Sequence, residues 1–344
     1  MRWRRSRRGR AVRAKGVVVN GYKVLANVTA VGMIAALASV PISQVMHADV
    51  ALLSADDPLS GSDTAIILGG TFEPKPSTVF AQTAENLYLH PLGFDDGATS
   101  SMVCDMIATD PCSAPLQVLT TPELIQQGPS SLTDANDVVL AVENEFNADP
   151  GAFSAADPLT IFGYSQSATA ESIAMTRLED SGIIPPDDLH FVFIGDPSLL
   201  PDGVWPNLVP DLDTIFGPTL TNTILTDLGM DGVLGNVTPD DLYPATIYTL
   251  DTDGVADWQQ DFQAGGLLDA ISHLFIQHAE YLGLTPDEIA NATTSTNGDL
   301  TLVDISDNIN NADAWIGAIE HGIASSGVLE SLFQSLELYF TNMF

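Results

Sequence analysis

The chain has 344 residues, of which 45% are apolar, so it is long enough for one large α/β domain with extensions. Its formal net charge is −34, and nine of its 11 Lys and Arg residues lie before residue 24, which leaves the rest of the chain strongly acidic. An acidic body repels phosphate groups, which argues against nucleic acid or an anionic membrane surface as a partner.

The first residues read as an export signal. The segment from Arg2 to Lys23 is basic, and an apolar segment of about signal-peptide length follows at 28–42. Cleavage near Ala48 or Ala51 would release a secreted protein, whereas an uncleaved segment would anchor the chain in a membrane. Both alternatives place the body outside the cytoplasm.

Cys104 and Cys112 are the two cysteines of the sequence. A short loop that contains Asp and Pro separates them, and in an oxidising compartment two such thiols can close a small ring. No histidine or second cysteine pair lies close enough in the sequence to complete a zinc site. We therefore expect a disulfide and no metal.

Short apolar runs alternate with helical patterns along the body. Strands are expected at 64–68, 116–120, 159–162, 191–194 and 246–250, and helices at 77–89, 132–146, 167–178 and 265–275. A polar loop is expected at 292–299 and a final amphipathic helix at 313–340. The alternation predicts an α/β fold, with a mostly parallel sheet and helices on both of its faces.

The sequence Gly-Tyr-Ser-Gln-Ser at 163–167 lies between an expected strand and an expected helix. Small residues at positions 163 and 167 allow a sharp turn that lifts Ser165 clear of the sheet. The first N–H groups of the helix, beginning at Gln166, then point toward a developing oxyanion. Ser165 is the predicted nucleophile, and Gln166 is one predicted oxyanion donor.

Two glycines end the first expected strand and lead into Thr71. Glycine allows the backbone to come close to a reacting carbonyl group, so this loop is expected to supply a second oxyanion donor. The candidate is the Thr71 N–H, with assistance from its hydroxyl.

The pattern loosens at about 199–243, where several prolines separate short apolar stretches. Long irregular segments in compact domains are usually functional or disordered, and the apolar content argues against disorder. We expect an inserted lid or cap over the active site.

A serine nucleophile needs a base, and imidazole is suited to that role near neutral pH. His278 follows the last expected strand and is preferred to His273 and His321, which remain alternatives. For the orienting acid, Asp253 is preferred to Asp257, since Gly254 and Val255 follow it in the Asp-x-aliphatic pattern of a turn common in hydrolases. The chain order Ser, Asp, His is that of an α/β-hydrolase.

Five motifs in order resemble the PE-PPE domain, the cutinase-like serine α/β-hydrolase module of mycobacteria and relatives. They are GGTFEPKPS at 69–77, GYSQSA at 163–168, FIGDP at 193–197, TDGVADW at 252–258 and HAEYL at 278–282. The resemblance covers about 65–284 and implies an esterase with the triad Ser165, Asp253 and His278 and an oxyanion hole at Thr71 and Gln166. The sequence departs from the family at Phe72, where glycine is usual, and no PE or PPE helical module precedes the domain.

Four parts are therefore expected: export signal or anchor with the start of a linker at 1–53, linker at 54–63, hydrolase domain at 64–284 and C-terminal helical extension at 285–344. The expected function is cofactor-free hydrolysis of lipid or glycolipid esters. Stand-alone relatives imply an alternative, transfer of acyl chains between trehalose glycolipids with the same triad. A third reading is a catalytically silent lipid-binding protein of the cell envelope.

Overall fold

A computed structural model describes residues 57–95, 97, 101–275, 277–306 and 312–318. The predicted export segment, His321 and most of the predicted helix at 313–340 lie outside the described residues. Within the described ranges, no helix has the length and apolar character that crossing a membrane requires.

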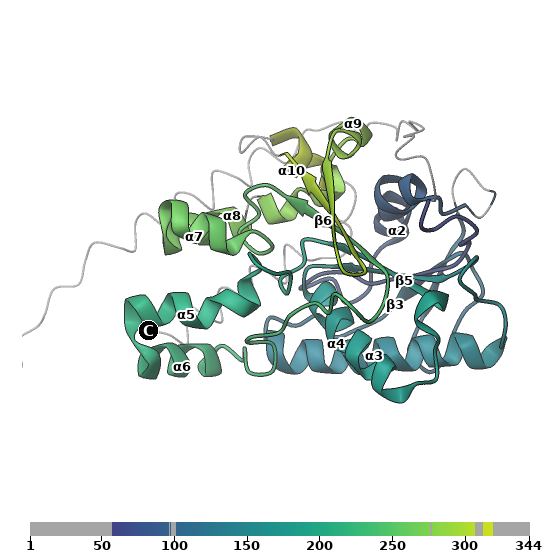
Figure 1. The fold of residues 1–344 in the computed structure, drawn as a ribbon, viewed down its shortest axis with the longest axis horizontal. Coiled ribbons are helices and arrows are strands. Elements are labelled where there is room, and N and C mark those ends of the chain that lie inside the picture. Colours follow the sequence, from purple (N-terminus) through teal and green to yellow (C-terminus); the bar gives the residue numbers. More distant parts are fainter. Residues whose placement is uncertain (1–56, 96, 98–100, 276, 307–311, 319–344) are drawn as a thin grey trace, which may run out of the picture. The chain divides into compact units, whose positions relative to one another are not determined.

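The body is built on one sheet of eight strands (Figure 1). The strands are β1 (Ala65–Ile67), β2 (Val103–Met106), β3 (Leu116–Leu119), β4 (Leu159–Tyr164), β5 (Leu189–Ile194), β6 (Ala245–Leu250), β7 (Thr293–Asn297) and β8 (Leu300–Ile305). Their order is β2-β3-β1-β4-β5-β6-β8-β7, and all neighbours are parallel except β7 and β8. All five predicted strands are present, and the sheet is mostly parallel as predicted.

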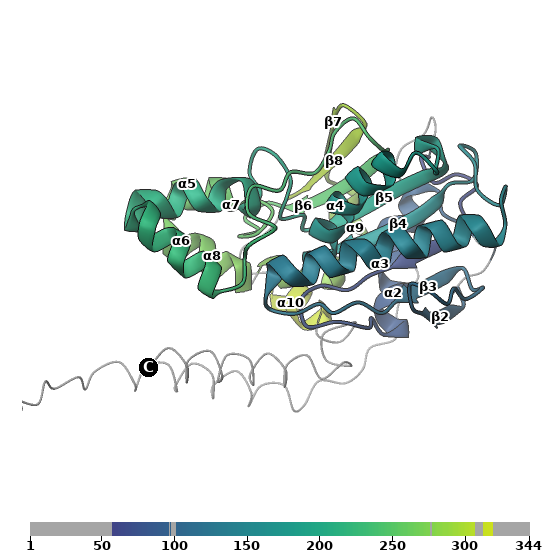
Figure 2. The same ribbon diagram turned by 90° about the horizontal axis from the view of Figure 1, so that it is seen from below.

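Helices cover both faces of the sheet (Figure 2). One face carries α3 (Gln127–Ala148) and α4 (Gln166–Ser181), and the other carries α2 (Thr78–Ala84), α9 (Pro286–Ala290) and α10 (Ala312–Ala318). Single turns of other helix types lie at 85–89, 90–92, 186–188, 277–279 and 281–283. Each face has its own buried apolar cluster, so the predicted α/β-hydrolase architecture is confirmed.

Two helical hairpins lie together beyond one end of the sheet and form the cap (Figure 1). The first hairpin is α5 (Val204–Phe216) with α6 (Pro218–Asp227), and the second is α7 (Trp258–Gly265) with α8 (Leu267–Phe275). The predicted irregular insertion at 199–243 thus contains two helices. Pro206 and Pro218 lie in first turns, where no helical N–H bond is lost, whereas Pro210 lies inside α5 and the helix continues past it.

A third apolar cluster and one indole hydrogen bond hold the cap together, and a second indole bond joins the cap to the sheet domain. Trp205 Nε1 of α5 donates to Thr169 Oγ1 of α4 at 2.8 Å, and Trp258 Nε1 of α7 donates to Asp211 Oδ2 of α5 at 2.9 Å. Both tryptophans are buried. The cap therefore packs directly on the helix that follows Ser165.

The prediction of a polar loop at 292–299 is wrong. Strand β7 occupies most of this segment, and β8 follows it as a parallel neighbour of β6. All five residues of β7 are exposed, so the strand has no buried face and no apolar alternation to reveal it. The sheet consequently continues to Ile305, beyond residue 284.

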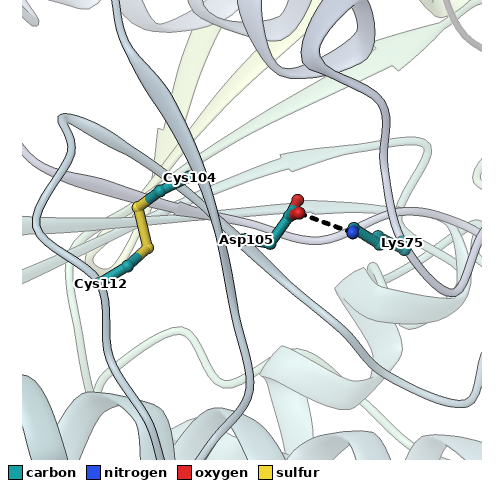
Figure 3. Close-up of a disulfide and its surroundings, with 4 residues drawn as sticks. All are labelled: Lys75, Cys104, Asp105 and Cys112. Carbon is teal, nitrogen blue, oxygen red and sulfur yellow. Dashed lines mark ion pairs between the residues drawn. A yellow bond between two sulfur atoms is a disulfide. The ribbon is translucent and has the colours of Figure 1, made fainter.

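The predicted disulfide joins Cys104 of β2 to Cys112 (Figure 3). Strand β2 was not predicted, because its residues are only partly buried at the edge of the sheet. Beside the disulfide, Lys75 Nζ and Asp105 Oδ2 form an ion pair at 2.6 Å. The covalent link closes the loop that connects β2 to β3.

Candidate active site

Ser165 lies on a sharp turn between β4 and α4. Its backbone has φ 60° and ψ −111°, a conformation that an L-residue rarely adopts without support from its surroundings. A Cβ at Gly163 would lie 2.5 Å from Glu171 Oε1, so a larger residue there would displace the buried Glu171 side chain. Ser167 Oγ accepts the Tyr164 N–H at 2.8 Å, which closes the turn. The predicted elbow is present, and the requirement for small flanking residues has a physical reason.

Three side chains from separate segments form a continuous hydrogen-bond chain. Ser165 Oγ lies 2.7 Å from His278 Nε2, and His278 Nδ1 lies 2.9 Å from both carboxylate oxygens of Asp253. Asp253 follows β6, and His278 lies in a single turn at 277–279. This is the geometry in which imidazole can remove the serine proton while a carboxylate fixes its tautomer.

The Asp253 carboxylate is completely buried but well satisfied. Burial by itself raises its pKa, yet the nearby His278 charge and hydrogen bonds from His278, Tyr281 and the Val255 N–H bring the net pKa below its ordinary value. Asp253 therefore stays ionised beside the imidazole at neutral pH.

The alternative acid, Asp257, has other partners. It accepts the Thr252 N–H at 3.2 Å and Gln260 Nε2 at 2.6 Å, and burial raises its pKa to about 7. The structure thus places Asp253, and not Asp257, against the imidazole of His278.

The alternative base, His273, pairs with Asp261 within the cap, where Nδ1 and Oδ2 lie 2.9 Å apart. Together with Asp269 these residues could offer three ligand atoms to a cation, within 4.8 Å of one another. None of the three belongs to the hydrogen-bond chain of Ser165.

The two predicted oxyanion residues are neighbours. Thr71 Oγ1 donates to Gln166 Oε1 at 2.8 Å, and Gln166 is the first residue of α4. A Cβ at Gly70 would lie 3.1 Å from the Tyr164 ring, so glycine lets this loop approach the elbow. Phe72 has φ 71°, a backbone conformation that favours glycine. The phenylalanine that stands here in place of the glycine usual in the family is therefore held in a strained conformation.

Sequence reasoning missed the residues that hold the site together. Gln127 Nε2 donates to both Thr71 Oγ1 and Gln166 Oε1, each at 3.0 Å. Tyr164 donates its hydroxyl to the His278 carbonyl, and Tyr281 donates to Asp253. The two tyrosines belong to recognised motifs, but nothing in the sequence distinguishes their hydroxyls from those of other buried tyrosines.

The sequence matches the model of the PE-PPE domain over residues 112–303, more than half of the chain. PPE family protein PPE28 of Mycobacterium tuberculosis is 30% identical over 67% of this chain and 31% of its own length. Esterase PE16 of the same species is 30% identical over 70% of this chain and 41% of its own length. The chain thus spans less than half the length of these curated relatives.

Among solved structures, a cutinase-like protein from Cryptococcus sp. is similar at 16% identity, with a TM-score of 0.33 over 65% of this chain and 92% of that one. The thioesterase domain of NocB from the nocardicin cluster is similar at 13% identity, with a TM-score of 0.33 over 76% of this chain and 93% of that one.

Proposed function

Because the chain belongs to the PE-PPE domain family, we propose that it is an exported serine hydrolase that cleaves carboxylic esters of lipids or glycolipids. The observation that carries the proposal is the unbroken hydrogen-bond chain from Ser165 through His278 to Asp253. The name of the relative Esterase PE16 supports an ester as the substrate class.

In the proposed mechanism, His278 Nε2 takes the Ser165 proton as Oγ attacks the ester carbonyl carbon. The new oxyanion accepts hydrogen bonds from the N–H groups of Thr71 and Gln166. Collapse of the tetrahedral intermediate breaks the bond to the alcohol, which leaves with the proton from His278. The product of this half-reaction is an acyl group bound to Ser165 Oγ.

The second half-reaction requires an acceptor. When water attacks, His278 removes its proton and returns it to Ser165 as the free acid leaves, and the enzyme is an esterase. When a sugar hydroxyl attacks instead, the same steps yield an acylated sugar, and the enzyme is an acyltransferase. Both outcomes use the same three residues, so analysis of the products separates them.

The acyl chain of the substrate is proposed to bind at the cap. The buried apolar cluster of α5 to α8 includes Val255, two residues after Asp253, so the cap lies next to the triad segment. Large apolar side chains of the cap such as Ile271 and Leu268 are exposed. We assign the segment 199–243, which contributes α5 and α6, as the inserted part of the cap, and residues 1–53 as the export signal or membrane anchor. An assay of culture fractions before and after removal of 1–53 tests export independently of activity.

The decisive experiment measures hydrolysis of p-nitrophenyl esters of graded acyl length by the wild type and Ser165→Ala, with and without trehalose. We expect release that depends on Ser165, and formation of acyl-trehalose would identify the transferase. Full activity of Ser165→Ala would overturn the proposal. Absence of both turnover and covalent labelling by a fluorophosphonate would favour a silent lipid-binding protein.

A further inference from the structure

Tyr281 connects the segments that carry the acid and the base. It lies three residues after His278, and its side chain is completely buried. Its hydroxyl donates to Asp253 Oδ2 at 2.7 Å and accepts the Leu250 N–H at 3.0 Å. Through one oxygen atom, the segment that carries the base is bonded both to the acid and to the end of β6.

The hydroxyl of Tyr281 meets a need of the buried carboxylate. Asp253 Oδ1 accepts the Val255 N–H at 2.8 Å, and both oxygens face His278 Nδ1. The Tyr281 hydroxyl supplies the donor on the side of Oδ2. Burial, followed by the charge of Asp253, raises the phenol pKa well above its ordinary value, so Tyr281 remains a donor throughout the neutral range.

A second tyrosine, at the end of β4, is hydrogen-bonded to the main chain of His278. Tyr164, the last residue of β4, donates its hydroxyl to the His278 carbonyl. The centroid of its ring lies 5.4 Å from that of the imidazole, and the Tyr281 centroid lies 6.2 Å from it. The imidazole therefore contacts two rings whose hydroxyls are both engaged in holding the triad segments.

We infer that Tyr281 is a positioning residue of the triad, which fixes the Asp253 carboxylate against His278 through its hydroxyl. The inference rests on the proposed function, because its readout is ester hydrolysis. It assigns to Tyr281 no contact with the substrate. Its effect reaches the reacting atoms through Asp253 and His278.

Tyr281→Phe removes the hydroxyl and keeps the ring. We expect kcat to fall about 10- to 100-fold, with KM changed less than about threefold. The reason is that a misplaced base lowers the stabilisation of the transition state but does not affect substrate binding. Without this donor the negative charge on Asp253 is less neutralised and stabilises a protonated imidazole more strongly. The pH at which kcat/KM falls to half on the acid side should therefore rise.

Other titratable groups near Asp253 and His278 are the same in the wild type and in Tyr281→Phe. The titratable groups that face Asp253, besides His278 and Tyr281, are Tyr164, Asp257 and Asp261. The half-maximal pH belongs to the coupled Asp253 and His278 pair, so only its shift between variants is interpreted.

Tyr248→Phe is the matched control. Tyr248 is buried and donates its hydroxyl at 3.3 Å to the carbonyl of Tyr88, away from the triad side chains. Its loss should lower the melting temperature without a change in the pH profile. The same outcome for Tyr281→Phe would reduce Tyr281 to a structural role and overturn the inference.

A second substitution keeps the test valid if Tyr281→Phe folds poorly. Replacement of Tyr281 by 3-fluorotyrosine keeps the hydroxyl and makes it a stronger donor, so the half-maximal pH should fall. An unchanged half-maximal pH in this variant would overturn the inference. Ser165-dependent hydrolysis by the wild type, measured in parallel, shows whether the proposed function or only the role of Tyr281 has failed.

Discussion

Thr71 Oγ1 donates to Gln166 Oε1 at 2.8 Å, so the two residues proposed to stabilise the oxyanion are joined through their side chains. Gln127 Nε2 donates to Thr71 Oγ1 and to Gln166 Oε1, and Gln166 Nε2 donates to Asp134 Oδ2 at 3.3 Å. The N–H of Phe72 donates to the Glu123 carbonyl at 2.8 Å, which also fixes the loop. The oxyanion loop is therefore held to α3 and α4 before any substrate binds.

Gln127→Met keeps the length of the side chain and removes its N–H donors. We expect kcat to fall about 10-fold with little change in KM, because a displaced Thr71 would misalign one oxyanion donor. Steady-state kinetics with a p-nitrophenyl ester measures the effect.

The control for this variant is Gln126→Met, one residue earlier on an exposed side chain. Gln126→Met should leave kcat unchanged. Equal kcat values for the two variants would show that the bonds from Gln127 to Thr71 and Gln166 do not contribute to catalysis.

Gly195 lies close to the imidazole of His278. Its φ is 60°, and a Cβ at this position would lie 2.8 Å from His278 Cε1 and 2.9 Å from Tyr281 Cε2. Gly195→Ala should therefore displace the imidazole and lower kcat at least 10-fold, besides a cost in stability of about 1 kcal/mol from the left-handed backbone.

Gly182→Ala separates these two effects. Gly182 has φ 61°, almost the same as Gly195, but a Cβ there would meet no atom within 4 Å. This variant should lose a similar amount of stability in urea and keep full activity. Comparable losses of activity in both variants would contradict the proposed contact with the imidazole.

The central strands and the elbow could be predicted because their signals are local. Strands β4, β5 and β6 are buried along their whole length and appear in the sequence as mostly apolar runs with β-branched and aromatic residues. The elbow requires a serine between small residues, all within five positions. Strand β7 could not be predicted, since its polar residues pair through the main chain with β8 and bury no side chain.

The supporting side chains of the site could not be predicted because their partners are remote in sequence. Gln127 bonds to Thr71, 56 positions away, and Tyr281 bonds to Asp253, 28 positions away. Such contacts depend on how the sheet brings loops together, and neither residue carries a local pattern. Asp253 was preferred to Asp257 from turn chemistry, and the structure adds the distance to His278 as a physical reason.

The disulfide between Cys104 and Cys112 lies at the edge of the sheet and should contribute to stability but not to catalysis. It closes a loop of eight positions, for which chain entropy predicts a stabilisation of about 2–3 kcal/mol. Replacement of both cysteines by alanine should lower the urea midpoint by a corresponding amount while kcat at 25 °C stays unchanged.

Lys75→Met provides a comparison on the same edge. It removes the ion pair with Asp105, whose side chains are 51% and 60% exposed, and such pairs contribute at most about 1 kcal/mol. The urea midpoint of this variant should lie close to that of the wild type. A loss of kcat in the cysteine variant would show instead that the edge strand influences the active site.

Glu73 should make the protein less stable as the pH rises. It is 3% exposed, and burial raises its pKa from 4.5 to about 8. Between these values the folded state holds a proton that the unfolded state releases, so the free energy of unfolding decreases with pH by up to about 1.4 kcal/mol per unit. Asp134 and Asp257, each with a pKa raised to about 7, act in the same direction.

The measurement is the urea midpoint from pH 6.5 to 8. Asp253, whose pKa is lowered, has finished titrating below this window in both states. His190, whose pKa burial lowers from 6.5 to about 4, is still half protonated in the unfolded state at pH 6.5, so it opposes the fall at the lower end of the window. Its contribution is the same in the wild type and in Glu73→Gln, so the difference between the two slopes reports Glu73. Glu73→Gln keeps the shape of the side chain but cannot ionise, so its midpoint should fall less steeply than that of the wild type. An equally steep fall would show that Glu73 is ionised in the folded protein and that other acids cause the pH dependence.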